Sequence, residues 1–454
     1  MNRHYHLIGI GGIGMSGIAK LLLIRGIGVS GSDLKETKIT DELKKLGAQV
    51  FIGHNLRNIQ GASLIIYSSA IKEDNPEIVE AKRQGIPLIK RAQALAQLME
   101  DKIVITVTGS HGKTTTTSLV SNLLLEAGLL PTVAIGGIFK NIDTNASIGD
   151  GDFFVAEADE SDGSFLYYQP KYSIITNIDY EHLDYYREFK NEIKTFKEFL
   201  NKTKEDGCVF ASCDDLNLKN ILKDYKNRYV LFGLKEDADI YPRNIKINGL
   251  TCEFDCSYKN KFIDRFYLAL GGMHNIYNAL SVIALGLELN IDLEVIKRTL
   301  ANYKGTCRRL EIKFNDEKYL VIDDYAHHPT QIKATLAAVK NLKPNRLIAV
   351  FQPHRYTRTK LLLDEFGKSF EPADYVIVTD IYPAQEVPLE GINGRCVCDK
   401  IREYYPNKKM LFLPKEEIVA HILEIIGLHD LVIMLGAGDI GKTCDELVGR
   451  LKSR

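Results

Sequence analysis

The sequence of 454 residues has almost no net charge and no apolar run long enough to span a bilayer. Its 58 basic and 59 acidic residues leave a net charge of −1, which gives no electrostatic basis for binding nucleic acid or an anionic membrane. The first residues lead directly into the apolar pair Leu7 and Ile8, so we expect no signal peptide. These absences predict a cytoplasmic protein with neither nucleic acid nor membrane as a partner.

The sequence also lacks low-complexity segments, internal repeats and the cysteine pattern of a structural zinc site. Its eight cysteines are scattered, and none of them forms a C-x-x-C pair. We therefore expect unpaired thiols in a reducing compartment.

The length is that of about three domains of ordinary size. Gly-punctuated blocks in which strands alternate with helices predict an α/β fold with mostly parallel sheets. We place the domains at residues 1–100, 101–311 and 312–454. In such sheets, ligands gather at the carboxyl ends of the strands.

Apolar runs identify the clearest elements. We expect strands at 7–10, 28–31, 64–67 and 87–89 in the first block, at 103–107, 153–156 and 172–175 in the second, and at 320–322, 347–351, 375–378 and 431–435 in the third. A helix is expected at 14–25. Residues 237–270 alternate between polar and apolar, which predicts β-hairpins.

The most informative motif follows the strand at 103–107 and precedes an amphipathic segment. It consists of Gly109, Ser110, His111, Gly112, Lys113, Thr114 and Thr115. A strand, a Gly-rich turn and Lys-Thr at the start of a helix form a triphosphate cradle, in which Lys reaches the phosphates and the Thr hydroxyl can ligate Mg²⁺. The loop is a shortened Gly-x-x-Gly-Lys-Thr, and it predicts that the protein uses ATP or GTP.

A second glycine cluster lies near the start of the chain. Gly9, Gly11 and Gly14 fit G-x-G-x-x-G between a strand and a helix, and Asp33 ends the next strand. This pattern predicts a diphosphate site, which suits NAD or a nucleoside diphosphate sugar. An NAD-dependent oxidoreductase therefore stays open as an alternative, although it does not explain the loop at Gly109.

Acidic residues follow two strands of the second block. Glu157, Asp159 and Glu160 come after the strand at 153–156, and Glu181 and His182 come after the strand at 172–175. Oxygen-rich sites suit Mg²⁺, which phosphoryl transfer from ATP requires. A lone loop histidine is usually a surface residue, but its place beside these carboxylates makes His182 a candidate ligand.

Together these motifs resemble the Mur ligases of bacterial peptidoglycan synthesis, in the order in which that family carries them. The matching segments are residues 9–17, 30–33, 68–71, 74–77, 109–115, 157–162, 272–279, 308–311, 323–330, 351–358 and 436–440. The resemblance covers essentially the whole chain.

The resemblance implies a Rossmann-like UDP-binding domain, a P-loop ATPase central domain and a Rossmann-like C-terminal domain that closes over ATP and the amino acid. It implies catalytic roles for Lys113, Glu157 and His182, with Thr114, Glu157 and His182 as the magnesium ligands. Besides the loop 109–115, the implied ATP contacts are Asn275, Arg309 and Asp324. The implied UDP-substrate contacts are Gly11, Gly12, Ile13, Gly14, Asp33 and Ser69, and those around L-alanine are Tyr325, His327, Arg355 and Arg358.

Within the family, the motifs are most similar to the branch that joins L-alanine to the lactyl carboxylate of UDP-N-acetylmuramate. The implied reaction uses ATP and Mg²⁺ and passes through an acyl phosphate, and we expect a monomer or weak homodimer. A tripeptide-recycling ligase of the same superfamily would share most motifs and is the nearer alternative. Lys194 and Lys197 lie at a plausible spacing for a carbamylated lysine, and we assign that role to neither.

Overall fold

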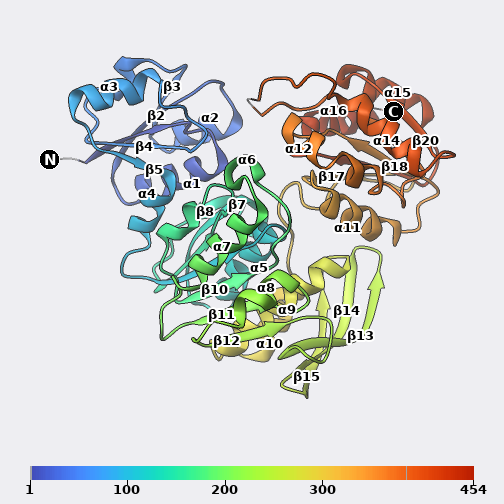
Figure 1. Ribbon diagram of the computed structural model, residues 1–454, viewed down its shortest axis with the longest axis horizontal. Helices are drawn as coiled ribbons and strands as arrows, with labels where there is room; N and C mark the ends of the chain where they lie inside the picture. Colours follow the sequence, from blue (N-terminus) through green and yellow to red (C-terminus); the bar gives the residue numbers. More distant parts are fainter. Residues whose placement is uncertain (1–2, 385, 454) are drawn as a thin grey trace. The chain divides into compact units, whose positions relative to one another are not determined.

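The computed structural model describes residues 3–384 and 386–453, except for the side chains of residues 183 and 184. It contains three sheets, one in each predicted domain (Figure 1). The chain divides into two compact units: unit 1 comprises residues 1–243, 256–264 and 277–304, and unit 2 the remainder. The α/β fold and the mostly parallel sheets agree with the prediction.

The first sheet has the strand order β3-β2-β1-β4-β5, and all of its neighbouring strands are parallel. Its strands are β1 (His4–Ile8), β2 (Gly28–Asp33), β3 (Gln49–Ile52), β4 (Leu64–Tyr67) and β5 (Leu88–Lys90). Its helices are α1 (Ile13–Ile24), α2 (Lys38–Lys45), α3 (Pro76–Gln84) and α4 (Arg91–Leu98), with a 3-10 turn η1 (Leu56–Ile59).

Two of the predicted strands in this domain are shifted in the structure. The strand predicted at 7–10 ends at Ile8, because Gly9 adopts a φ of +81° that turns the chain out of the sheet. The strand predicted at 87–89 begins one residue later, since Pro87 has no N–H for the ladder. The predicted helix at 14–25 is shifted by one residue to Ile13–Ile24.

The second sheet has ten strands in the order β15-β14-β13-β12-β11-β10-β6-β9-β7-β8. They are β6 (Ile103–Thr108), β7 (Thr132–Phe139), β8 (Thr144–Ser147), β9 (Phe153–Glu157), β10 (Tyr172–Ile175), β11 (Cys208–Ser212), β12 (Tyr229–Phe232), β13 (Ile240–Asn248), β14 (Thr251–Tyr258) and β15 (Lys261–Leu268). The last three are consecutive neighbours joined by two-residue connections, which confirms the predicted hairpins.

The helices of this region are α5 (Lys113–Glu126), α6 (Leu183–Tyr186), α7 (Phe189–Leu200), α8 (Leu216–Leu222), α9 (Met273–Glu288) and α10 (Leu293–Ala301), with the 3-10 turn η2 (Ser164–Tyr167). Strand β6 is central and lies parallel to both β9 and β10. Its apolar side chains Val104, Ile105 and Val107 are buried, as expected for a strand covered on both faces. The three strand ends that carry the predicted ATP motifs therefore meet at one edge.

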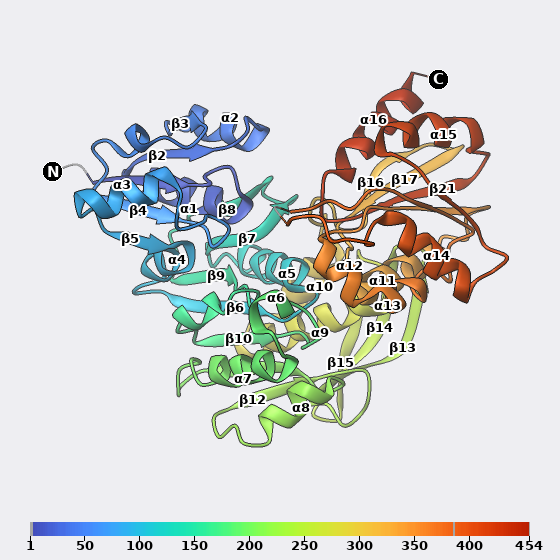
Figure 2. The ribbon, with the colours of Figure 1, turned by 45° about the horizontal axis from the view of Figure 1, so that its top comes forward.

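Helix α1 of the first domain lies beside β8 of the second, within unit 1 (Figure 2), and polar side chains join the two. The Lys20 ammonium donates to Thr144 Oγ1 and to Asn145 Oδ1, each at 3.1 Å. The amide of Asn145 donates to the carbonyl oxygen of Ile13 at 2.7 Å. These bonds, which are buried or partly buried, hold α1 against the second sheet.

The third sheet has the order β16-β17-β21-β18-β19-β20 and is parallel except for its edge strand β16. The strands are β16 (Glu311–Asn315), β17 (Tyr319–Asp324), β18 (Leu347–Phe351), β19 (Tyr375–Val378), β20 (Lys409–Phe412) and β21 (Asp430–Leu435). The helices are α11 (Pro329–Lys340), α12 (Tyr356–Leu361), α13 (Leu363–Gly367), α14 (Gly394–Tyr404), α15 (Ile418–Ile425) and α16 (Ile440–Lys452), with the 3-10 turn η3 (Lys415–Glu417). The buried apolar runs of β18 and β21 form its centre.

Two further expectations concern the whole chain. None of the eight cysteines, all of which the structure describes, forms a disulfide. Within the described residues, no helix is both long and apolar enough to cross a membrane.

Candidate active site

The connection from β6 to α5 has the geometry of a phosphate-binding loop. Gly109 and Gly112 adopt φ values of +124° and +85°, which L side chains rarely reach. A Cβ on Gly109 would lie 2.2 Å from Thr176 Oγ1. Helix α5 begins directly after Gly112, whose lack of a side chain leaves the first N–H groups of the helix without a side-chain cap.

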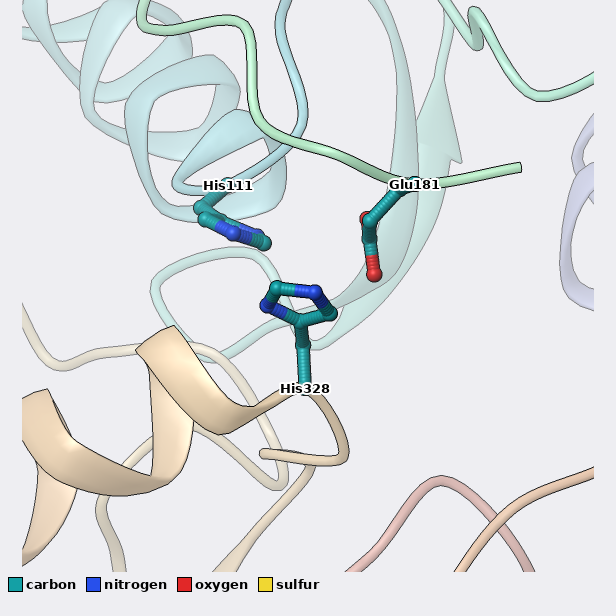
Figure 3. Close-up of side chains that lie close together, drawn as sticks. All are labelled: His111, Glu181 and His328. Atoms are coloured by element: carbon teal, nitrogen blue, oxygen red, sulfur yellow. The ribbon is translucent and has the colours of Figure 1, made fainter. Parts of the chain in front are cut away.

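The loop is held by residues that follow β10. The side chain of Asn177 accepts a hydrogen bond from the N–H of His111 and donates one to its carbonyl, at 2.9 and 3.0 Å. Thr176 Oγ1 donates to the same carbonyl at 2.6 Å. The imidazole of His111, shown beside α5 in Figure 3, lies 2.7 Å from Asp179 Oδ2. Thr176 and Asn177 were not predicted as site residues, although both directly follow a strand end.

Lys113 lies over this loop and faces the carboxylates after β9. Its ammonium donates to the carbonyl of Gly109 at 2.6 Å and to Glu160 Oε1 at 2.7 Å. Burial lowers the pKa of Lys113, but the charges of Glu160, Asp159 and Glu157 outweigh burial and raise it overall. The lysine therefore carries a permanent positive charge at the carboxyl end of the central strand.

Thr114 and Glu157, two of the magnesium ligands that the resemblance implies, lie in contact. Thr114 Oγ1 donates to Glu157 Oε1 at 3.1 Å, and Glu157 Oε2 accepts from the N–H of Gly136 at 2.8 Å. A hydroxyl and a carboxylate at the start of a phosphate-loop helix are a suitable donor pair for Mg²⁺.

His182 lies against Glu160 and near Glu181. Both His182 and Glu181 are on the loop after β10, and Glu181 is labelled in Figure 3. The Nε2 of His182 is 3.2 Å from Glu160 Oε1 and 3.6 Å from Glu181 Oε2, and the His182 backbone has a φ of +56°. Burial lowers the pKa of His182, while Glu160 and Glu181 raise it more strongly. Glu160, which was not chosen as a site residue from the sequence, thus connects Lys113 to His182.

Glu160 also has an oxygen available for a ligand. Its side chain is fully buried, and among the described residues its Oε2 has no hydrogen-bond partner. A buried carboxylate oxygen without a partner is costly unless a cation or a donor occupies it.

The first glycine cluster forms a second loop of the same kind. The N–H of Gly11 donates to Asp33 Oδ2 at 2.9 Å, and the N–H of Gly12 donates to the carbonyl of Gly9 at 3.1 Å. Helix α1 begins at Ile13, directly after the N-cap residue Gly12, which gives its first turn no side-chain cap. Ser69 is exposed after β4, the strand beside β1. These positions suit a diphosphate.

In unit 2, Asp324 at the end of β17 holds the chain around it. Its two oxygens accept hydrogen bonds from the N–H groups of Leu310 and Ala326, at 2.6 and 2.8 Å. The guanidinium of Arg309 lies 4.8 Å from the centre of the Tyr325 ring. Asn275, also in unit 2, donates to the carbonyl of Gly271 at 2.8 Å. The predicted ATP residues are therefore distributed over both units, with the loop 109–115 in unit 1.

The residues predicted around L-alanine gather beside β17 and β18, and His354 connects them. The ring of His327 lies 5.4 Å from that of Tyr325 and 5.6 Å from that of His354. Arg358 Nη1 is 3.1 Å from His354 Nδ1. Burial and then the charges of Arg358 and Arg355 lower the pKa of His354 to about 3, so this histidine is neutral and accepts from Arg358.

Arg355 precedes α12 in a strained conformation. Its φ is +70°, and its N–H donates to the carbonyl of Tyr382 at 2.8 Å. Strain of this kind outside glycine is concentrated at functional positions. The structure thus brings Tyr325, His327 and Arg358 together, with Arg355 three residues before Arg358.

Three family models match successive parts of the chain. The Mur ligase family catalytic domain matches residues 4–103, the Mur ligase middle domain residues 107–286, and the Mur ligase glutamate ligase domain residues 308–438. Each match coincides with one of the three sheets.

Curated relatives match along almost the full length. The UDP-N-acetylmuramate–L-alanine ligase of Syntrophus aciditrophicus is 44% identical over 451 residues, which cover 99% of this chain and 94% of that protein. The enzyme of the same name from Aquifex aeolicus is 43% identical over 447 residues, covering 98% of this chain and 97% of that protein.

Solved structures of ligases also match this chain along nearly its full length. The UDP-N-acetylmuramate–alanine ligase of Thermotoga maritima has a TM-score of 0.86 at 30% identity over 99% of both chains. A murein peptide ligase from Psychrobacter arcticus shares the fold, with a TM-score of 0.75 at 22% identity, covering 100% of this chain and 99% of that one. Because the relatives match along almost the full length and three Mur ligase family models match successive parts of the chain, the chain belongs to the Mur ligase family.

Proposed function

We propose that the protein is an ATP-dependent ligase that joins L-alanine to the lactyl carboxylate of UDP-N-acetylmuramate in peptidoglycan precursor synthesis. The observation that carries the proposal is the group formed by Lys113, Thr114, Glu157 and Glu160 around the uncapped start of α5. The full-length similarity to relatives named for this reaction supports the choice of substrates. The NAD-dependent alternative has no support from any of these relatives.

In this proposal, ATP binds with its phosphates on the loop 109–115. The N–H groups of that loop and the Lys113 ammonium neutralise charge on the γ-phosphoryl group as the lactyl carboxylate attacks it. The products are an acyl phosphate and ADP. The amine of L-alanine then attacks the acyl carbon, phosphate leaves, and an amide forms without a covalent enzyme intermediate.

The donor set around α5 fits Mg²⁺. Thr114, Glu157 and His182 would hold it, and the unpartnered oxygen of buried Glu160 supports a cation close by. Magnesium would supply charge neutralisation on the phosphates. Asn275, Arg309 and Asp324 are proposed as further nucleotide contacts on the C-terminal side.

The amino acid is proposed to bind at the cluster of Tyr325, His327, Arg355 and Arg358. A guanidinium can clamp the carboxylate of an incoming amino acid through two parallel hydrogen bonds. Neutral His354 accepts from Arg358 and so orients it toward such a group.

UDP-N-acetylmuramate is proposed to place its diphosphate on residues 11–14, near Asp33 and Ser69. The lack of a membrane-spanning helix among the described residues is compatible with action in the cytoplasm, which we propose together with a monomeric or weakly dimeric state.

Phosphate release measured with ATP, UDP-N-acetylmuramate and single amino acids tests the proposal. We expect release that depends on both the UDP-sugar and L-alanine. Release with the tripeptide in place of L-alanine would instead identify a peptide-recycling ligase, and ATP-independent reduction of NAD would identify an oxidoreductase.

A further inference from the structure

Arg91 lies against the first glycine loop, far from it in sequence. It is the first residue of α4, and its side chain is only 19% exposed. A Cβ added to Gly14 would lie 3.0 Å from Arg91 Nη1 and 3.1 Å from its Cδ. The guanidinium therefore rests on the first turn of α1, where the N–H groups of the helix are available to an anion.

The donors of this guanidinium are not used within the protein. Among the described residues, Arg91 makes one ion pair, with Asp159 at 3.7 Å, which is too long for a hydrogen bond, and it has no hydrogen-bond partner. A guanidinium has five N–H donors, and none of the Arg91 nitrogens is fully buried, so these donors remain accessible to a ligand. The arrangement therefore favours an anionic ligand at this position.

Arg91 lies between residues of the two phosphate loops. It packs against Gly14 of the first loop and pairs with Asp159, which interacts with Lys113 of the second. Asp159 follows β9 and interacts with Lys113 as well as with Arg91, and both charges lower its pKa against the effect of burial. Burial raises the pKa of Tyr168, directly after η2, and the nearby charge of Arg91 opposes that rise. The buried hydroxyl of Tyr168 has no hydrogen-bond partner among the described residues. The guanidinium thus lies beside the diphosphate loop on one side and the acidic residues of the ATP site on the other.

We propose that Arg91 is a substrate-binding residue that donates to an anionic oxygen group of the UDP-linked substrate, either its diphosphate or its lactyl carboxylate. Both groups offer the paired oxygens that a planar guanidinium binds in a bidentate manner. The inference rests on the proposed function. In that function the substrate has two anionic groups, a diphosphate that would lie near Gly14 and a lactyl carboxylate that would lie toward Lys113.

Calorimetric binding without ATP tests this assignment, with UDP-N-acetylglucosamine and UDP-N-acetylmuramate as probes. Only the second probe carries the lactyl carboxylate. We expect Arg91→Met to weaken binding of UDP-N-acetylmuramate about 10- to 100-fold. If affinity for both probes falls equally, Arg91 contacts the diphosphate. If only affinity for UDP-N-acetylmuramate falls, Arg91 contacts the lactyl carboxylate.

Two variants separate ligand binding from a structural role. Arg25 also ties α1 to α4, since its Nη2 donates to the carbonyl of Leu98 at 3.0 Å. Arg25→Met should keep the affinity of the wild type within about twofold, whereas a role of Arg91 in merely holding α4 predicts a similar loss for both arginines. Asp159→Asn removes the one ion-pair partner of Arg91, and it should leave UDP-sugar affinity unchanged or increase it.

Wild-type affinity for both probes in Arg91→Met would overturn the inference while leaving the proposed function intact. If the wild type binds neither probe, the proposed function fails as well. Should Arg91→Met not fold, as judged by circular dichroism and by binding of an ATP analogue, Arg91→Gln provides the same test, and retained affinity in that variant would equally overturn the inference.

Discussion

At the scale of single residues, Lys113 is the clearest target. Lys113→Ala should lower ligation by at least about a thousandfold, because a preorganised charge on the transferred phosphate contributes several kcal/mol. Affinity for the UDP-substrate should stay within about threefold, since its loop is a separate one. Steady-state kinetics and calorimetry measure both quantities. Lys171→Ala, which removes a surface pair with Asp206, is the control. Loss of UDP-substrate binding in a folded Lys113→Ala protein would contradict the assignment of two separate loops.

Glu192 makes stability depend on pH. It lies on α7, is fully buried, and among the described residues neither of its oxygens has a hydrogen-bond partner. Burial raises the pKa of Glu192 to about 8. Between about pH 5 and about pH 8 the folded protein holds this proton and the unfolded chain does not, so the free energy of unfolding falls as pH rises.

Glu192→Gln should remove this fall in the free energy of unfolding with rising pH. Its free energy of unfolding should exceed that of the wild type by a margin that grows with pH, to about 1–3 kcal/mol near pH 8.5. Denaturant unfolding from pH 6 to 9 measures it. Glu198→Gln, on the same helix and half exposed beside Lys194, should follow the wild type. Parallel pH profiles for wild type and Glu192→Gln would refute the raised pKa.

His182 should control the use of magnesium. His182→Ala is expected to raise the magnesium concentration for half-maximal rate and to lower turnover, because it removes a proposed ligand beside Glu160. Titration of the initial rate with Mg²⁺ measures both effects. His421→Ala, which removes a ring paired with Tyr375 in the third sheet, is the control. An unchanged magnesium dependence would return His182 to a structural role.

At the scale of elements, the β6–α5 connection requires glycine at a fixed position. Gly109→Ala should weaken ATP binding at least about tenfold, because its Cβ would overlap Thr176 Oγ1 and its φ of +124° disfavours any side chain. Binding of a fluorescent ATP analogue measures the loss. Gly128→Ala, at the other end of α5, also has a positive φ but would meet nothing within 4 Å, so it separates local strain from damage to the loop. Equal affinities for the two variants would show that the loop tolerates the change.

At the scale of the whole molecule, the two chemical steps should be separable. Arg355→Ala and Arg358→Ala should lower the efficiency with L-alanine about 30- to 1,000-fold, because a lost bidentate contact costs about 2–4 kcal/mol. The KM for ATP should change little. The acyl phosphate forms before alanine attacks, so these variants should still produce it, detectable by borohydride reduction. An unchanged alanine dependence in both variants would remove these arginines from the amino-acid site.

Much of the fold and of both loops could be predicted from the sequence because their causes are local. The run from Ile103 to Val107, the two glycines and Lys113 specify a strand, a turn and a helix start within a dozen residues. Strands 64–67, 172–175, 347–351 and 375–378 lie where their apolar runs predicted. The edge strands β3 and β20 were not predicted. Each is only four residues long, and its run of three apolar residues is too short to distinguish a strand from other structure.

Only the tertiary structure decided which side chains meet. Glu157 and Glu160 belong to one acidic segment, yet the turn after β9 directs the first to Thr114 and the second to Lys113 and His182. Arg91 reaches Gly14 and Asp159 although it is distant from both in sequence. Local patterns determine where a strand ends and a helix begins, because backbone conformation depends on neighbouring residues. Contacts between distant side chains depend on how whole sheets and helices pack, and no local pattern encodes that.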